Sequence, residues 1–130
     1  MSLDLLIIVF VFGAIGSLLR FALTSLWPAR SGRIPLGVLL ANWTGSLIGG
    51  TILGLLGTLL LGNDLSHAVF AGFCGGLTTF STWAVDVVLA ARAKSSRLAV
   101  LNAILNILGS IVMFALGYLL PIILFMTLIG

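Results

Sequence analysis

The chain has 130 residues, of which 61% are hydrophobic, with six Lys or Arg and three Asp or Glu, and its mean hydropathy is +1.33. An ordinary soluble domain carries about 25% charged residues, so this composition excludes a water-soluble globule. The length accommodates four helical membrane crossings of about 20 residues each, with little chain left over.

Residue counts also exclude several kinds of site. Cys74 is the single cysteine, so no disulfide can form within the chain, and with His67 as the single histidine no Cys/His zinc spacing exists. The net charge of +3 comes from basic residues scattered around apolar segments, which form no stripe that could follow nucleic-acid phosphates. We therefore interpret the basic excess as a signal of membrane topology.

The charged residues divide the chain into four apolar segments. We expect helices over approximately 3–27, 34–62, 65–91 and 98–120, forming one transmembrane unit over 1–130. The first segment has no basic residue before it and is longer than the apolar part of a signal peptide, so we expect it to remain in the protein. Because none of the segments alternates polar and apolar residues as a barrel strand does, the predicted fold is all-α.

Arg20 is the first polar residue inside an expected helix, close to the end of 3–27 that precedes the first basic loop. It could be an interfacial anchor whose charged end reaches the headgroups. Alternatively, it could place a positive charge at the mouth of an anion pathway and raise the local anion concentration.

The second expected helix carries Asn42 and two adjacent faces of small residues, which let helices approach closely. Spacing does not tell whether these faces meet helices of the same chain or of a second subunit. The two faces are formed by Ala41, Gly45 and Gly49 and by Ser46, Gly50 and Gly54.

The third expected helix contains an unusual run from Gly72 to Thr82, GFCGGLTTFST, in which three glycines and four hydroxyl residues share eleven positions. Each glycine weakens a helix by roughly 1 kcal/mol relative to alanine, and Ser and Thr offer the backbone other hydrogen bonds. The run therefore predicts a break, which at membrane depth must face protein or an aqueous cavity. A packed kink whose hydroxyls bond back to carbonyls is the alternative.

The fourth expected helix has Asn102, Asn106 and Ser110 on one stripe, four residues apart. The stripe could be a hydrogen-bonded seam between helices, or a track of neutral donors that replaces the hydration shell of a moving anion. Phe80 and Trp83 could present positive ring edges to the same anion or pack as ordinary apolar residues.

Basic residues are distributed unequally between the loops. Five of them flank the first and third connections, and none lies near the N-terminus, the second connection or the C-terminus: Arg30, Arg33, Arg92, Lys94 and Arg97. By the positive-inside rule these two connections face the cytoplasm, so both termini face outward. All three acids are Asp4, Asp64 and Asp86, so the helices offer no central carboxylate for a proton-coupled exporter.

Three motifs in order, GAIGSLLR at 13–20, NWTGS at 42–46 and the run at 72–82, resemble the Fluc fluoride channels, which are small bacterial proteins with four transmembrane helices per subunit. The resemblance covers nearly the whole chain. It implies an antiparallel dimer in the bacterial plasma membrane, with two narrow pores that passively conduct fluoride out of the cell, exclude chloride and involve no enzymatic step.

The resemblance also assigns roles to residues. It implies that the carbonyls of Gly75 and Thr78 from both subunits hold a structural sodium ion at the dimer centre, and that Arg20 lies near the vestibule of the pore. The pore itself would be lined by Phe80, Trp83, Asn42, Thr79, Ser81, Thr82, Asn102, Asn106 and Ser110.

Three departures from the family pattern keep alternatives open. Trp83 stands where a second pore phenylalanine is usual, so its indole could narrow the path, donate a hydrogen bond or belong to a pore that does not conduct. Asn102 and Asn106 replace a common tyrosine and a small hydroxyl residue. The one-sided loop charges favour a heterodimer with an oppositely oriented homologue over a homodimer. A non-conducting scaffold half of such a heterodimer and, more remotely, a small multidrug-type exporter are the other hypotheses.

Overall fold

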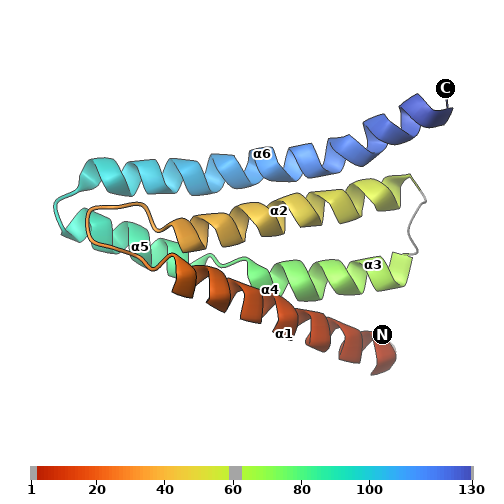
Figure 1. Ribbon diagram of the computed structural model, residues 1–130, viewed down its shortest axis with the longest axis horizontal. Coiled ribbons are helices and arrows are strands. Elements are labelled where there is room, and N and C mark those ends of the chain that lie inside the picture. Colours follow the sequence, from red (N-terminus) through yellow and green to blue (C-terminus); the bar gives the residue numbers. More distant parts are fainter. Residues whose placement is uncertain (1–2, 59–62, 130) are drawn as a thin grey trace.

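The computed structural model describes residues 3–58 and 63–129, and their secondary structure is helical. Two connections, 27–35 and 93–95, lie together at one end of the molecule, and the start of the first helix and the end of the last lie at the other (Figure 1). The elements are α1 (Leu3–Leu26), α2 (Leu36–Gly57), α3 (Asn63–Val69), the π-helical turn η1 (Phe70–Cys74), α4 (Gly75–Leu77), α5 (Ser81–Arg92) and α6 (Ser96–Ile129).

Four of the helical segments are long and apolar enough to cross a membrane, with α3 to α5 acting as one crossing. The protein is therefore an all-α, multi-pass membrane protein, as the composition predicts. The expected second helix, 34–62, begins slightly later in the structure, and its last residues, 59–62, lie outside the described part of the chain.

The last helix is longer than expected. It continues through Pro121 to Ile129, beyond the end near residue 120 that we anticipated. After Arg97 the sequence has no charged residue that would mark an end. A proline costs one helical hydrogen bond, but a membrane helix tolerates it when its surroundings satisfy the freed group.

Small residues bring α2 and α6 into direct contact along their length (Figure 1). A Cβ atom at Gly50 would overlap the carbonyl oxygen of Phe114, and one at Gly54 would overlap that of Tyr118. The face that contains Gly45 and Gly49 instead packs against the third crossing. Both small-residue faces of α2 therefore meet helices of the same chain, which resolves a question that spacing left open.

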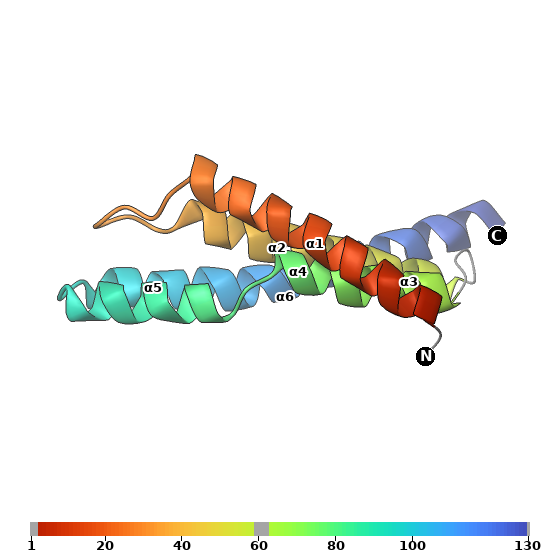
Figure 2. The same cartoon turned by 90° about the horizontal axis from the view of Figure 1, so that it is seen from below.

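The third crossing is broken, as the glycine and hydroxyl run predicts. α4 ends at Leu77, Thr78 is extended with φ −76° and ψ 154°, and α5 begins only at Ser81. Figure 2 shows the extended link between α4 and α5. The π-helical turn η1, which precedes α4, was not predicted from the sequence; Gly72 in this turn packs directly on the backbone of Val9 in α1.

Candidate functional site

The break is held by a side chain from another helix. Asn42 Oδ1 in α2 accepts a hydrogen bond from the backbone N–H of Thr79 at 2.7 Å, and Asn42 Nδ2 donates to the Thr79 carbonyl at 3.0 Å. The amide thus replaces the helical partners that the extended link gives up. This matters because an unsatisfied peptide group at membrane depth costs several kcal/mol.

Two residues of α1 satisfy further carbonyls near the break. Arg20 Nη1 donates to the Thr78 carbonyl at 3.3 Å, and Ser17 Oγ donates to the Gly76 carbonyl at 3.5 Å. Arg20 therefore bonds to the break, which the sequence did not predict. The half-buried guanidinium also places a positive charge beside it.

The hydroxyl residues of the run organise the start of α5. Thr79 Oγ1 accepts from the backbone N–H of Thr82 at 3.3 Å and donates to the Thr82 hydroxyl at 3.1 Å, with Ser81 Oγ 3.4 Å away. A side-chain oxygen that binds an early backbone N–H stabilises a helix start. The side chains of Thr79, Ser81 and Thr82 therefore lie together at the start of α5, and their hydroxyls form hydrogen bonds with one another.

A cavity of about 310 Å³ lies beside the break, between the third crossing, α2 and α6. It brings together six of the residues proposed for the pore and adds Thr78, Ser46 and Ile107. The six are Asn42, Thr79, Phe80, Trp83, Asn106 and Ser110.

Two buried donors of this cavity have no partner within residues 3–58 and 63–129. They are Trp83 Nε1 and Asn106 Nδ2. Asn42 explains the orientation of Asn106, since Asn42 Nδ2 donates to Asn106 Oδ1 at 2.7 Å and leaves the amide nitrogen of Asn106 unused. Asn42 itself donates to two acceptors and so has no spare N–H. Two of the residues that line the cavity therefore carry unpaired N–H donors, which can form hydrogen bonds to a small anion.

Phe80 and Trp83, which both line this cavity, form an aromatic pair. Their ring centroids are 5.0 Å apart with planes at 58°, and the Phe80 side chain is 76% exposed in the single chain. Ring edges carry partial positive charge, so such a pair can face an anion.

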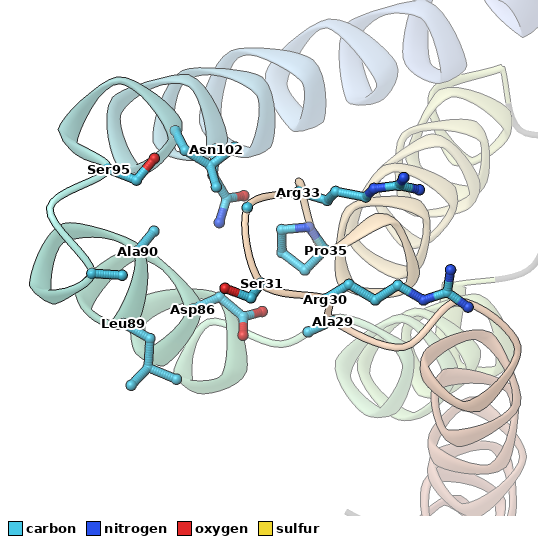
Figure 3. A pocket seen from close by; sticks show the side chains of 13 residues that line it. Ala29, Arg30, Ser31, Arg33, Pro35, Asp86, Leu89, Ala90, Ser95 and Asn102 are labelled. Carbon is cyan, nitrogen blue, oxygen red and sulfur yellow. The ribbon is translucent and has the colours of Figure 1, made fainter.

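Asn102 does not join the other polar residues of α6. It lines a separate cavity of about 280 Å³, at the end of the molecule where the two basic connections meet. Figure 3 shows this cavity between α5, α6 and the connection 27–35, with Asp86 across from Asn102. Asn102 Oδ1 and Asp86 Oδ2 are buried and unpaired in the described parts of the chain. Asp86 was not among the predicted site residues; the only signal for it was a lone carboxylate in an apolar helix.

Gly75 and Thr78 line a groove of about 320 Å³ that also includes Gly45, Ser46 and Gly49. A Cβ atom at Gly75 would meet open space, so nothing in residues 3–58 and 63–129 covers the groove at that point. Over the described residues, no group of three or more His, Cys, Asp or Glu could hold a metal ion. Backbone carbonyls are the oxygen donors that this groove offers.

The sequence profile of the family described as CrcB-like protein, Camphor Resistance (CrcB), matches residues 7–118. The chain belongs to the CrcB family. The match includes the break, the cavity beside it and the cavity that Asn102 lines, whereas the final turns of α6 lie beyond the match.

Named relatives of this CrcB-family chain cover most of its length. It is 37% identical to the fluoride-specific ion channel FluC of Serratia proteamaculans over 92% of this chain and 95% of that protein. The FluC proteins of Pectobacterium atrosepticum and Francisella philomiragia are 39% and 36% identical, over 87% and 88% of this chain and 90% and 92% of theirs.

Proposed function

We propose that this chain is a subunit of a fluoride-selective channel that passively releases fluoride from the cytoplasm and catalyses no reaction. Family membership and the names of its relatives support this function. The structural observation that carries it is the pair of buried, unpaired donors, Trp83 Nε1 and Asn106 Nδ2, in one cavity beside the helix break.

The chemistry of fluoride suits this cavity. Fluoride is small and strongly hydrated, so a path through the membrane must replace its water with close hydrogen-bond donors that do not hold it too tightly. Neutral N–H groups and ring edges meet that need. The amino end of α5, which begins at Ser81 beside the cavity, adds a favourable dipole for an anion.

We assign the roles of the pore residues from their hydrogen bonds. Asn42 positions the break and Asn106, because both of its amide hydrogens are donated within the chain. Trp83 and Asn106 are the donors to fluoride, with Ser110 as a further cavity hydroxyl. Thr79, Ser81 and Thr82 shape the link. Because Thr79 Oγ1 donates its hydrogen to Thr82 Oγ1, the Thr82 hydroxyl is the further donor of this group.

The vestibule roles follow from position. Arg20 provides a positive charge beside the break, where it attracts anions while it bonds to Thr78. Asn102 faces the cavity at the basic end of the molecule, with Ser31 and Asp86 (Figure 3). We propose that this cavity is the vestibule by which fluoride reaches the cavity at the break.

A second, inverted subunit would complete the pore, which makes the functional unit an antiparallel dimer. Two features of the single chain support this proposal: the largely exposed Phe80 ring and the open space at Gly75. Broken backbone at membrane depth is tolerated only when protein or water covers it. The corresponding break of an oppositely oriented subunit would cover this region with similar polar groups.

The carbonyls of Gly75 and Thr78 fit a sodium ion, which prefers oxygen ligands and would link the two subunits structurally. Both residues line the uncovered groove. The Thr78 carbonyl accepts one hydrogen bond from Arg20, and a carbonyl oxygen has two lone pairs, so one remains for a cation. The groove carbonyls are neutral, which suits a singly charged ion.

The partner is an oppositely oriented homologue rather than a second copy of this chain. Five basic residues flank the connections 27–35 and 93–95, and these connections lie at the same end of the molecule (Figure 1). This bias favours a single orientation in a bacterial plasma membrane, with both termini on the outer side. A C-terminal tag should be accessible from the outside only; accessibility from both sides would restore the homodimer.

The experiment that tests the function is fluoride efflux from liposomes that contain this chain with its partner. Fluoride efflux should persist when the proton gradient is clamped. Liposomes loaded with chloride in place of fluoride should show no efflux of chloride. Transport that disappears without a proton gradient would contradict a passive channel and support an exporter, for which the helices lack a central carboxylate.

A non-conducting scaffold half is the second candidate, and Trp83 in place of a pore phenylalanine is the observation that favours it. Substituting Phe80 in this chain, and separately the matching residue of the partner, distinguishes the two. Loss of flux from the partner's substitution alone would identify this chain as the scaffold, whereas loss from Phe80→Ile would place a working pore here.

A further inference from the structure

The connection between α1 and α2 carries a pair of arginines on a tight turn. Arg33 N donates to the Arg30 carbonyl at 3.1 Å, and Gly32 has a φ of +76°. A hydrogen bond from the fourth residue to the first, with glycine at positive φ in the third position, is typical of a type II turn. The turn holds the α-carbons of Arg30 and Arg33 within about 7 Å of each other.

Both arginines line a cavity of about 170 Å³ on one side of this turn. In Figure 3 the two guanidinium groups extend in the same direction, away from the cavity that contains Asp86. No acidic residue lines the smaller cavity, and within the described residues neither arginine forms an ion pair. The cavity is also lined by Leu26, Trp27, Pro28 and Leu36.

The cavity lies where the membrane surface is expected. α1 ends at Leu26 and α2 begins at Leu36, so the turn projects from the ends of two membrane-spanning helices. Trp27 is 44% exposed, and Leu26 and Leu36 beside it are also exposed. Tryptophan is enriched at the level of lipid headgroups, where its apolar ring and polar N–H are both accommodated.

Paired guanidinium groups match the geometry of a phosphate. Each can form two parallel hydrogen bonds to phosphate oxygens, and the interaction is strengthened by opposite charge. The apolar residues around the arginines would contact the glycerol and upper acyl carbons of a lipid. A free phosphate ion has no apolar part that could make these contacts. The lining therefore favours a phosphate that carries an apolar group.

We propose that Arg30 and Arg33 bind the phosphate of one anionic phospholipid, whose glycerol and acyl carbons contact Trp27, Leu26 and Leu36. Both arginines also line the cavity proposed as the vestibule, but their guanidinium groups extend away from it, toward the lipid site (Figure 3). The lipid site differs from a diffuse attraction of lipid to the five basic residues, because it requires the two arginines of the turn.

Native mass spectrometry of the detergent-purified protein tests this proposal, with phosphatidylglycerol as the probe and phosphatidylcholine as the neutral comparison. The double variant R30Q/R33Q should retain phosphatidylglycerol at least about tenfold less than the wild type, since it removes both guanidinium groups that form charge-assisted hydrogen bonds to the phosphate. The variant R92Q/R97Q removes the same charge at the same end of the molecule and should stay within about twofold of wild type, because these residues do not line the cavity.

Three outcomes would overturn the proposal. Equal losses in R30Q/R33Q and R92Q/R97Q would indicate diffuse charge. Equal retention of phosphatidylcholine by the wild type would indicate that the anionic headgroup is not recognised. Displacement of the lipid by an equal concentration of inorganic phosphate would indicate a site for the free ion. Because the turn is exposed, both variants should remain monodisperse, which size-exclusion chromatography checks.

Discussion

The side-chain amide of Asn42 pairs with both backbone polar groups of Thr79, accepting from its N–H at 2.7 Å and donating to its carbonyl at 3.0 Å. A residue of α2 thereby takes the place of the helical hydrogen bonds that are missing at the break. Its remaining N–H donates to Asn106 Oδ1 at 2.7 Å, which leaves the Asn106 amide nitrogen without a partner in the described residues. One side chain therefore fixes both the break and the orientation of a donor in the cavity.

Asn42→Asp should nearly abolish fluoride efflux. A carboxylate cannot donate to the Thr79 carbonyl or to Asn106 Oδ1, and its charge repels the anion. Asn42→Ala should leave the buried polar groups of Thr79 unpaired at about 1–3 kcal/mol each, which lowers the stability of the purified protein. Thr44→Ala on the same helix is the control, because its hydroxyl bonds only to carbonyls of its own helix. Unchanged efflux in Asn42→Asp would contradict the assigned role.

Trp83→Phe should reduce fluoride efflux by about tenfold, because a hydrogen bond to a charged group is worth roughly 1.5–3 kcal/mol. The substitution removes the unpaired indole N–H and keeps an aromatic ring next to Phe80. Trp43→Phe is the matched control, since its indole N–H donates to the Leu105 carbonyl at 3.0 Å and Trp43 does not line the cavity. If Trp83→Phe transports as well as wild type, the indole is not a fluoride donor.

Gly50→Ala should destabilise the packing of α2 on α6. The added Cβ atom would overlap the carbonyl oxygen of Phe114, so the two helices must move apart, at a cost of roughly 1–3 kcal/mol for overpacking. Gly57→Ala is the comparison, because open space surrounds that position and alanine favours a helix. Thermal unfolding in detergent should show a lower Tm for Gly50→Ala only. A lower Tm for both would point to helix flexibility instead of close packing.

Lys94→Gly should stabilise the end of α5 by about 0.5–1 kcal/mol. Lys94 has a φ of +57°, a backbone conformation that residues with a side chain disfavour. Ser95 N donates to the Ala90 carbonyl and Lys94 N donates to the Ala91 carbonyl, both at 3.1 Å. These two bonds form a Schellman motif, in which the position of Lys94 is usually occupied by glycine. Lys94→Ala is the control that removes the same charge without relieving the backbone. A higher Tm for Lys94→Ala than for Lys94→Gly would contradict the explanation.

The main features of the fold follow from local chemistry in the sequence. Four crossings are predicted because charges interrupt long apolar runs, and the break is predicted because glycine and hydroxyl residues crowd the segment 72–82. The π-helical turn and the full length of α6 could not be predicted. The first depends on how Gly72 packs on α1, and the second on how the surroundings of Pro121 satisfy the backbone.

The site was predicted in composition but not in arrangement. Asn42, Phe80, Trp83, Asn106 and Ser110 were identified as polar or aromatic anomalies, and the structure places them around one cavity. Their spacing could not show that Asn42 uses its donors internally, because this depends on the register of α2 against the break. For the same reason, the stripe on α6 could not show that Asn102 belongs to a different cavity.

A passive, fluoride-selective path is best tested by the reversal potential of the current that this chain carries with its partner in a planar bilayer, with fluoride on one side and chloride on the other. We predict a potential set by the fluoride gradient and unchanged when a pH difference is imposed across the membrane. A potential that follows the chloride gradient, or that moves with the pH difference, would contradict a passive fluoride-selective path.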